Sequence, residues 1–309
     1  MKIRYEVVSH VGCVRSNNED IALVLGKTFR DASEKGAAEL HRHSRLTALV
    51  SDGMGGYEGG EVASEMVVDS FADYLLSDSL PTGMDADDVV ASVNQWVAQA
   101  QAAIAQQAAL NQKLNQMGAT FTGIFGYEGQ LFLINVGDSR AYRLRDGVLK
   151  RLTTDHSLRE LHRDESLPSN VIYNAFGLND VFAHIKCITQ QVLQGDAFLI
   201  CSDGLHDMVD DETIERMLSD GCSAQALVDK ALENGGEDNV TVVLLFFDDM
   251  SPATDRESER INPYDEAPQV SEAMAPGTLL QGRRPFRATW CRLQFPMNTM
   301  NNNHRQQQK

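Results

Sequence analysis

The stretch ATFTGIFGYEGQLFLINVGDSRAYRLRDGVLKRL, residues 119–152, is a run of apolar segments separated by turns of two or three residues. Each segment has the length and the aromatic and β-branched content typical of a strand. The predicted strands are Ala119–Tyr127, Gln130–Val136, Arg140–Arg145 and Val148–Leu152. Asp146-Gly147 is a hairpin signal. Strands that are joined by such short turns are antiparallel neighbours. The stretch therefore predicts an antiparallel meander.

Helices and strands follow in separate groups on both sides of this meander. Upstream, Leu46–Val50 is typical of a buried strand, and apolar spacing predicts two consecutive helices over 61–76 and Asp88–Leu110. Downstream, the predicted elements are strands at Ala197–Cys201 and Val240–Phe247 and helices at Asp211–Leu218 and Ala224–Leu232. Because strands are grouped with strands and helices with helices, the order predicts a layered α+β fold and not a doubly wound one.

Length and composition indicate one large domain followed by a tail. The chain has 309 residues, and 42% of them are hydrophobic, which is enough to bury a sizeable core. Six of the eight prolines lie beyond Asp249, together with Asn and Gln runs. We therefore predict a folded domain over residues 1–249 and a disordered tail over residues 250–309.

Charge and cysteine content restrict the partners and the compartment. The formal net charge of -17 disfavours nucleic acid and anionic membranes as partners. None of the five cysteines forms a Cys-x-x-Cys pair, which argues against a disulfide framework or a zinc knuckle and favours a reducing cytoplasm. The N-terminus lacks the apolar run of a signal peptide, and no segment approaches a membrane-spanning length. Cys13 fits the pattern of a small buried apolar residue.

Acidic residues recur at predicted strand ends and turns. They are Glu19-Asp20, Asp52-Gly53, Asp138, Asp203-Gly204 and Asp238-Asn239. Any single Asp-Gly is first of all a turn dipeptide. Asp52 and Asp203, however, each end an apolar run, which would place both carboxylates at the rim of a buried sheet. Such all-oxygen donors suit Mg²⁺ or Mn²⁺ and disfavour zinc. Two ions bridged by a carboxylate can activate a water for attack on a phosphoryl group.

Arg15 and the glycines after Asp52 fit the same chemistry. Arg15 lies four residues before Glu19 and offers a planar donor fork for phosphate oxygens, although a surface position is the ordinary fate of an arginine. The stretch Asp52–Gly60 is glycine-dense, but it lacks the Gly-Lys-Ser/Thr of a P-loop and the glycine spacing of a dinucleotide fingerprint. Glycine there lets the backbone approach an ion closely, with the Gly53 carbonyl as a ligand.

Six motifs occur in order along the chain. They are Arg15-Ser-Asn-Asn-Glu-Asp20, Ser51-Asp-Gly-Met-Gly-Gly56, Gly118-Ala-Thr120, Val136-Gly-Asp-Ser-Arg-Ala-Tyr142, Ser202-Asp-Gly-Leu-His-Asp207 and Glu237-Asp-Asn-Val-Thr241. Together they resemble the ordered motif set of the metal-dependent protein phosphatase family, type 2C, and the resemblance spans residues 7–247. It implies an α+β fold, a four-layer α-β-β-α sandwich of two mainly antiparallel sheets, with the metal site in a cleft at one edge.

The resemblance also implies a ligand set for two cations, Mn²⁺ or Mg²⁺. Asp52 would bridge the two ions. Glu19 and the Gly53 carbonyl would serve one ion, and Asp203 and Asp238 would serve the other.

The remaining matched positions would act around these ions. Asp20 would act mainly through bound waters, and Arg15 would bind the substrate phosphate, so Arg15 and Asp52 are the expected catalytic residues. Asp138 and Asp207 match positions that hold a weaker third ion in some members of the family.

Two departures from the family pattern concern the general acid and the flap. Met54 stands where many eukaryotic members have a histidine, and Met54-Gly55-Gly56 resembles the bacterial branch. The segment 157–195 resembles the family's mobile flap but is short, and Asn170–Gly177 within it offers no arginine.

The histidines are assigned structural roles from their positions. His156 and His206 lie near the expected site, where hydrogen bonding within the scaffold is their expected role. His41 and His43 fall in the polar segment Asp31–Arg45, which predicts a loop.

These inferences lead to a protein serine/threonine phosphatase that acts on phosphorylated proteins. A bacterial-type Ser/Thr kinase would be its natural opponent, and a monomer in the cytoplasm is expected. Two alternatives stay open at this point: a non-catalytic phosphoprotein-binding regulator with the same fold, and a phosphatase for small phosphorylated metabolites.

Overall fold

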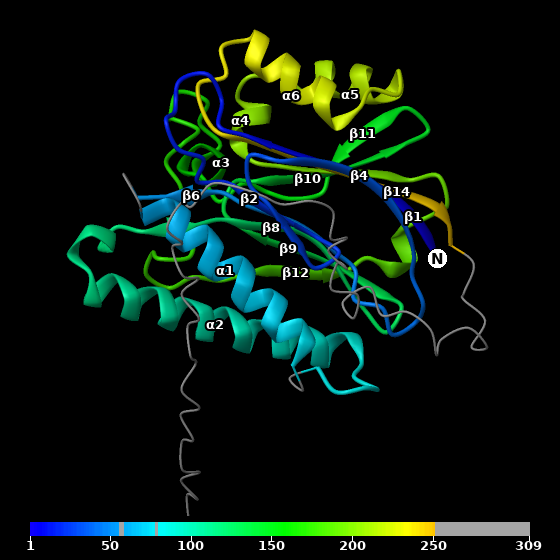
Figure 1. Ribbon diagram of the computed structural model, residues 1–309, viewed down its shortest axis with the longest axis horizontal. Helices are drawn as coiled ribbons and strands as arrows, with labels where there is room; N and C mark the ends of the chain where they lie inside the picture. Colours follow the sequence, from blue (N-terminus) through cyan, green and yellow to red (C-terminus); the bar gives the residue numbers. More distant parts are fainter. Residues whose placement is uncertain (56–58, 78–79, 251–309) are drawn as a thin grey trace, which may run out of the picture. The chain divides into compact units, whose positions relative to one another are not determined.

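Two six-stranded antiparallel β-sheets lie face to face at the centre of the protein (Figure 1). The computed structural model describes residues 1–55, 59–77 and 80–250. The predicted tail therefore lies outside the described residues beyond residue 250, and its boundary stays a prediction. No helix of the described part is long and apolar enough to cross a membrane.

The two sheets are named A and B. In spatial order, sheet A contains β11 (Val148–Arg151), β10 (Arg140–Arg145), β13 (Ala197–Cys201), β14 (Val240–Asp249), β1 (Lys2–His10) and β4 (Ser33–Glu39). Sheet B contains β12 (His184–Cys187), β9 (Gln130–Val136), β8 (Phe121–Tyr127), β5 (Thr47–Ser51), β2 (Ile21–Val24) and β3 (Lys27–Phe29). A third, small ribbon pairs β6 (Gly53–Met54) with β7 (Gly118–Ala119).

Helices cover the outer face of each sheet, which gives four layers (Figure 1). The long helices α1 (Gly59–Leu76) and α2 (Ala86–Leu110) pack on sheet B, and α4 (Asp203–His206), α5 (Asp211–Ser219) and α6 (Ala224–Glu233) pack on sheet A. The short elements α3 (Leu158–His162), η1 (Gln112–Leu114) and η2 (Thr189–Gln191) lie in the connections. The predicted α-β-β-α sandwich is confirmed.

Three apolar clusters hold these layers together. One lies between sheet B and the α1–α2 pair and is built around Phe71, Trp96 and Phe121, whose rings stack edge to face or tilted. A second fills the space between the sheets, and a third lies between sheet A and helices α5 and α6. Burial of both faces explains why β5 and β13 show no alternation: every residue of the two strands is buried, and the central residues of both are apolar.

The meander and the helices predicted from the sequence are confirmed to within a few residues at their ends. The prediction that His41 and His43 are loop residues is confirmed, because both lie between β4 and β5, outside any strand. The polar segment Asp31–Arg45 is not a loop throughout, since Ser33–Glu39 forms the edge strand β4, paired with β1. Its residues alternate between exposed and half-buried, so the strand lacks the apolar alternation that identifies strands in sequence. Gly36 there lies against the ring of Tyr5, where a Cβ would meet the ring carbon Cζ at 2.5 Å.

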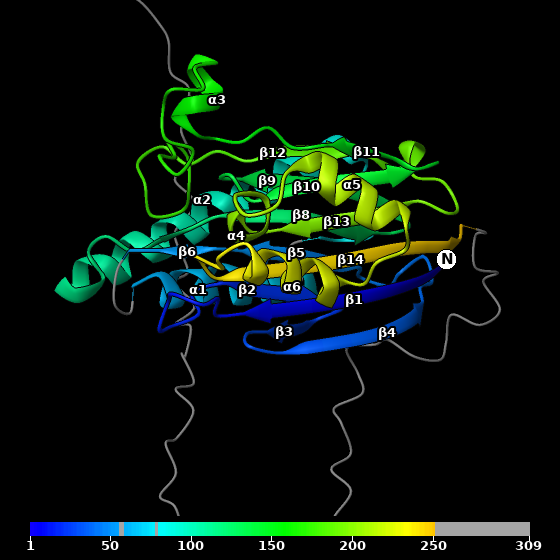
Figure 2. The same ribbon diagram turned by 90° about the horizontal axis from the view of Figure 1, so that it is seen from above.

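The segment that follows β11 leaves the sandwich before it returns as β12. Figure 2 shows α3 projecting beyond the sheet layers. The bridge between Ser157 and Ile172 closes the segment on itself, and the bridge between Ala119 and Phe176 ties it to β7. Gln101 of α2 also holds it, since its amide donates to the Leu178 carbonyl at 2.6 Å and accepts from the Gly177 N–H at 2.9 Å.

Candidate active site

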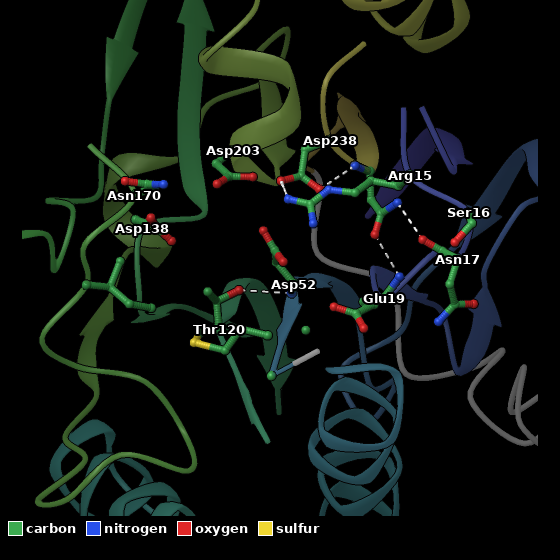
Figure 3. Close-up of a pocket in the computed structure, with 15 residues that line it drawn as sticks. Arg15, Ser16, Asn17, Glu19, Asp52, Thr120, Asp138, Asn170, Asp203 and Asp238 are labelled. Carbon is green, nitrogen blue, oxygen red and sulfur yellow. Dashed lines mark hydrogen bonds and ion pairs between the residues drawn. The ribbon is translucent and has the colours of Figure 1, made fainter. Parts of the chain in front are cut away.

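A pocket of about 500 Å³ opens at the edge of the sandwich where β5 and β13 end (Figure 3). Its lining residues are Arg15, Ser16, Asn17, Glu19, Asp52, Gly53, Met54, Gly55, Thr120, Asp138, Asn170, Ile172, Asp203, Asp238 and Asn239. Seven of the nine residues singled out from the sequence are among them. Asp20 and Asp207 are the two that do not line the pocket.

Strand ends and a backbone clamp place the central carboxylates. Asp52 follows β5 directly, and its N–H donates to Thr120 Oγ1 at 3.0 Å while its carbonyl accepts from the Thr120 N–H at 2.9 Å. Ser51 Oγ donates to the Thr120 carbonyl at 2.6 Å. Asp203 begins α4, with Ser202 alone between it and the end of β13. The apolar runs that end at these positions thus deliver both side chains to the same rim.

Glycines beside Asp52 allow the chain to pass close to Glu19. A Cβ on Gly53 would lie 2.1 Å from the Gly60 carbonyl oxygen, and a Cβ on Gly60 would lie 2.5 Å from Glu19 Oε2. Contacts this short do not occur in proteins. Gly53 and Gly60 therefore permit the close packing of β6, the first turn of α1 and the Glu19 side chain.

The clustered carboxylates disfavour each other's charged forms. Desolvation, followed by repulsion from Asp203, raises the pKa of both Asp52 and Asp138 well above its usual range. Desolvation also raises the pKa of Asp203 and that of Glu19. Four acidic groups held in one partly desolvated pocket cost free energy as anions, and a bound divalent cation relieves that cost.

Asp20 lies behind the pocket wall and is almost completely buried, at 1% exposed. Its Oδ2 accepts from Ser202 Oγ at 2.6 Å, whereas its Oδ1 has no hydrogen-bond partner. Desolvation raises the pKa of Asp20 to about 7. A buried acceptor without a protein partner fits a water ligand, which agrees with the indirect role that the sequence resemblance implies.

Arg15 points into the pocket and pairs with Asp238 (Figure 3). Its Nη2 lies 2.6 Å from Asp238 Oδ2, and the two side chains are 57% and 39% exposed. Ion pairs this exposed contribute only about 0–1 kcal/mol. Arg15 is therefore held at the pocket by an ion pair. Replacing Asp238 by a phosphate oxygen as the partner of Arg15 would cost little free energy.

The two residues matched to a third ion differ in their surroundings. Asp138 lines the pocket and is buried, whereas Asp207 lies outside the lining. Burial disfavours the Asp207 carboxylate, but His206, with Nδ1 at 3.3 Å from its Oδ1, outweighs that effect and lowers its pKa. His206 Nε2 also lies 3.2 Å from the Asp138 carbonyl oxygen, so this histidine bonds within the scaffold as expected.

His156 likewise forms hydrogen bonds within the scaffold, as predicted. His156 Nδ1 lies 2.9 Å from the Gly137 N–H nitrogen and 2.7 Å from Asn174 Nδ2.

Cys13 is exposed, so its predicted burial is wrong. Its N–H donates to the Gly236 carbonyl at 2.7 Å, which fixes the backbone of this loop while the side chain stays at the surface.

Two further residues, Asn239 and Ser64, hold the backbone of Glu19 in place. This role was not predicted from the sequence. Asn239 Oδ1 accepts from the Glu19 N–H at 2.8 Å, and its Nδ2 donates to the Val11 and Asn17 carbonyls, both at 2.9 Å. Ser64 Oγ of α1 donates to the Glu19 carbonyl at 2.6 Å. The sequence did contain a signal for Ser64, because it is a polar residue on the apolar face of a predicted helix.

The donor set fits a hard divalent cation in its chemistry. It consists of carboxylates and a backbone carbonyl, and the orphaned Asp20 Oδ1 and the raised carboxylate pKa values both favour a bound cation. Within residues 1–55, 59–77 and 80–250, however, no three His, Cys, Asp or Glu side chains lie together as a ready ligand group. The carboxylates surround the pocket without converging on a common point.

Comparison with known proteins agrees with this geometry. The profile of the family described as protein phosphatase 2C matches residues 26–239. The chain belongs to that family. It is 36% identical over 255 residues to the serine/threonine protein phosphatase PstP of Mycobacterium tuberculosis, covering 78% of this chain and 44% of PstP. It is 30% identical over 237 residues to the serine/threonine phosphatase stp of Listeria monocytogenes, covering 71% of this chain and 92% of stp.

Solved structures of the mycobacterial phosphatase show the same fold. The crystal structure of PstP matches with a TM-score of 0.64 and 34% identity, covering 81% of this chain and 100% of the solved one. The PstP catalytic domain in complex with two manganese ions matches with a TM-score of 0.61 and 33% identity, covering 80% and 99%. The chain thus spans less than half the length of the full mycobacterial relative, and its match corresponds to that protein's catalytic domain.

Proposed function

We propose that this chain is a metal-dependent protein serine/threonine phosphatase that hydrolyses phosphoserine and phosphothreonine. The observation that carries the proposal is the gathering of five carboxylates and Arg15 around one pocket of about 500 Å³. A pocket that offers acidic oxygens for cations and a guanidinium for phosphate combines the two requirements of phosphomonoester hydrolysis. The similarity to PstP and stp supports the same reaction class.

Two Mn²⁺ or Mg²⁺ ions would be held by the acidic wall. Asp52 would bridge them, with Glu19 and the Gly53 carbonyl on one side and Asp203 and Asp238 on the other. When bound, such ions lower the pKa of a coordinated water and neutralise phosphoryl charge. The manganese complex of the related catalytic domain supports two ions.

The groups behind and beside this set would act more weakly. Asp20, with its unpartnered Oδ1, would hold a water of the ion shell. Asp138 and Asp207 would contribute to a third, weaker ion, and the His206 contact that lowers the Asp207 pKa keeps that carboxylate charged for the purpose.

Arg15 would bind the phosphate oxygens of the substrate. Its exposed pair with Asp238 positions the guanidinium at the pocket wall at little energetic cost. Met54 also lines the pocket but cannot donate a proton, so the proton for the leaving serine or threonine oxygen would come from water. Asn170 reaches the pocket from the segment 157–195, which gives this segment a place in substrate choice.

The partners follow from the reaction. Phosphorylated proteins would be the substrates, with a bacterial-type Ser/Thr kinase as the opposing enzyme, and the protein would work as a cytoplasmic monomer. The absence of a Cys-x-x-Cys pair and the formal charge of -17 support a reducing compartment without nucleic-acid partners.

The decisive experiment is phosphate release from a phosphothreonine peptide. We expect turnover with Mn²⁺ or Mg²⁺ and its loss on addition of a chelator. Turnover that persists in the chelator would contradict the metal-dependent mechanism. Binding of the phosphopeptide without turnover in any divalent ion would instead identify a non-catalytic regulator. A kcat/KM for small phosphorylated metabolites well above that for the peptide would identify a metabolite phosphatase.

A further inference from the structure

A second, much smaller pocket lies between the sheets, away from the candidate active site. Its lining residues are Leu133, Arg143, Leu152, Lys186, Ile188, Gln191, Val192 and Phe198, none of which lines the larger pocket. Its volume is about 40 Å³. One water needs about 10–15 Å³ on the same scale, so the pocket has room for a group of a few heavy atoms. β10 and β12, which contribute to it, lie on the same side of the sandwich (Figure 2).

Strand register directs two cationic side chains into this space from opposite sheets. Arg143 of β10 lies opposite Phe198 of β13, and Lys186 of β12 lies opposite Leu133 of β9. Phe198 and Leu133 both belong to the apolar cluster between the sheets. Because directly opposed residues of paired strands share a face, Arg143 and Lys186 emerge on the inner side of their sheets.

Neither cation has a carboxylate partner in the described residues. Arg143 donates from Nη1 to the Gln191 carbonyl at 3.2 Å, while its Nε is buried without a hydrogen-bond partner. Lys186 is exposed and forms no ion pair in the described part of the chain. By contrast, Arg145, two residues further along β10, is held by both oxygens of Asp196 at 2.6 Å. The two cations next to the small pocket thus have donor capacity to spare.

The floor of the pocket is apolar. Phe198, Ile188, Val192 and Leu133 are 1%, 4%, 5% and 6% exposed. A ligand seated here meets two cationic donors at the mouth and hydrocarbon beneath them. A phosphate would press charged oxygens against that hydrocarbon, whereas a carboxylate carries all its charge at one end.

We propose that this pocket binds a small carboxylate with a short aliphatic chain. The carboxylate would bridge the Arg143 guanidinium and the Lys186 ammonium, and the chain would lie against Phe198 and Ile188. Such a ligand supplies the missing counter-charge and covers apolar surface at once. The site does not depend on the phosphatase chemistry of the larger pocket, because no residue is shared between the two.

The test is a titration of the full chain with butyrate, butyramide and inorganic phosphate, followed by NMR of the Leu133, Ile188 and Val192 methyl groups. We expect saturable shifts with butyrate only, since butyramide lacks the charge and phosphate lacks the chain. Following these methyl groups separates the small pocket from any phosphate bound in the larger one. Losing a charge-assisted hydrogen bond should weaken butyrate binding at least about tenfold in Arg143→Gln and about threefold in Lys186→Gln, whose exposed ammonium forms a weaker pair.

Lys113→Gln is the matched control, because Lys113 is another exposed lysine and lies outside the pocket. It should bind butyrate like the unaltered protein. Lys186 is exposed, so its variant keeps the test informative even if Arg143→Gln folds poorly. Absence of saturable methyl shifts at millimolar butyrate would overturn the proposal. So would equal shifts with butyramide or phosphate, or equal weakening in Lys113→Gln.

Discussion

Adding one methyl group at Gly60 should displace Glu19 from the candidate active site. A Cβ at this position would lie 2.5 Å from Glu19 Oε2 and 2.7 Å from the Gly53 carbonyl carbon. Ordinary contacts begin at 3.4 Å, so the Glu19 carboxylate must retreat by about 0.9 Å, the difference between 3.4 and 2.5 Å. The Gly53 contact is with backbone, which cannot give way as a flexible side chain can. Gly60→Ala therefore perturbs two of the predicted metal-binding groups at once.

The neighbouring position provides a control in the same helical turn. A Cβ on Gly59 would meet only Met117, at 3.3 Å from its Cβ. Replacing glycine by alanine in a helix gains about 0.5–1 kcal/mol, whereas overpacking costs about 1–3 kcal/mol. Gly59→Ala should therefore be as stable as the unaltered protein or slightly more stable. Gly60→Ala should lose about 0.5–2 kcal/mol, because the clash exceeds the helical gain.

Activity should separate the two variants more strongly than stability does. A catalytic group misplaced by about 1 Å can cost about a hundredfold in rate, so kcat of Gly60→Ala should fall by about that factor. Its Mn²⁺ affinity, measured by calorimetric titration well below the melting temperature, should fall in parallel. Agreement between Gly60→Ala and Gly59→Ala within about threefold in both kcat and Mn²⁺ affinity would contradict the predicted displacement of Glu19.

Four other perturbations test the same site. Asp52→Asn should abolish turnover and Mn²⁺ binding, whereas Arg15→Ala should lose about ten- to two-hundredfold in kcat/KM, partly through KM, with Mn²⁺ affinity retained in calorimetry. Asn239→Ala removes three partly buried hydrogen bonds and should lower the free energy of unfolding by about 2–4 kcal/mol in urea titration, against less than about 1 kcal/mol for the exposed Asn94→Ala. Burial raises the pKa of Asp20 from 3.8 to about 7, so the folded state binds this proton more tightly, and its stabilising effect is lost as pH rises through 7. In chelator, the melting temperature should therefore increase on going from pH 7.5 to pH 5.5, and Asp20→Asn should flatten that increase.

The sequence was sufficient for the layers of the fold and for the rim of the site. The central residues of β5 and β13 are apolar without alternation because both faces of each strand are buried, and this made Asp52 and Asp203 recognisable as residues at strand ends. Hairpin signals such as Asp146-Gly147 located the meander, since such turns need the left-handed backbone that both residues adopt. These features are local, so a window of a few residues contains them.

Features that depend on long-range contact were not predictable in the same way. β4 is a polar edge strand, and its sequence shows no clear alternation of apolar and polar residues. Its strand structure is therefore evident only from its pairing with β1. The pair between Arg15 and Asp238 joins residues 223 positions apart, and no local pattern indicates it. The exposure of Cys13 depends on how its loop lies on Gly236, which the sequence alone does not reveal.

The arrangement of the site also explains why its supporting residues have to be so firmly bonded. Carboxylates that raise one another's pKa repel each other whenever they are charged, so each must be anchored through its backbone to stay in place. Thr120 anchors Asp52 and Asn239 anchors Glu19, in both cases through main-chain hydrogen bonds that leave the carboxylate free. A cation that entered the pocket would meet carboxylate oxygens already present in its walls. The anchoring residues therefore preserve the geometry that the repulsion between the carboxylates would otherwise disperse.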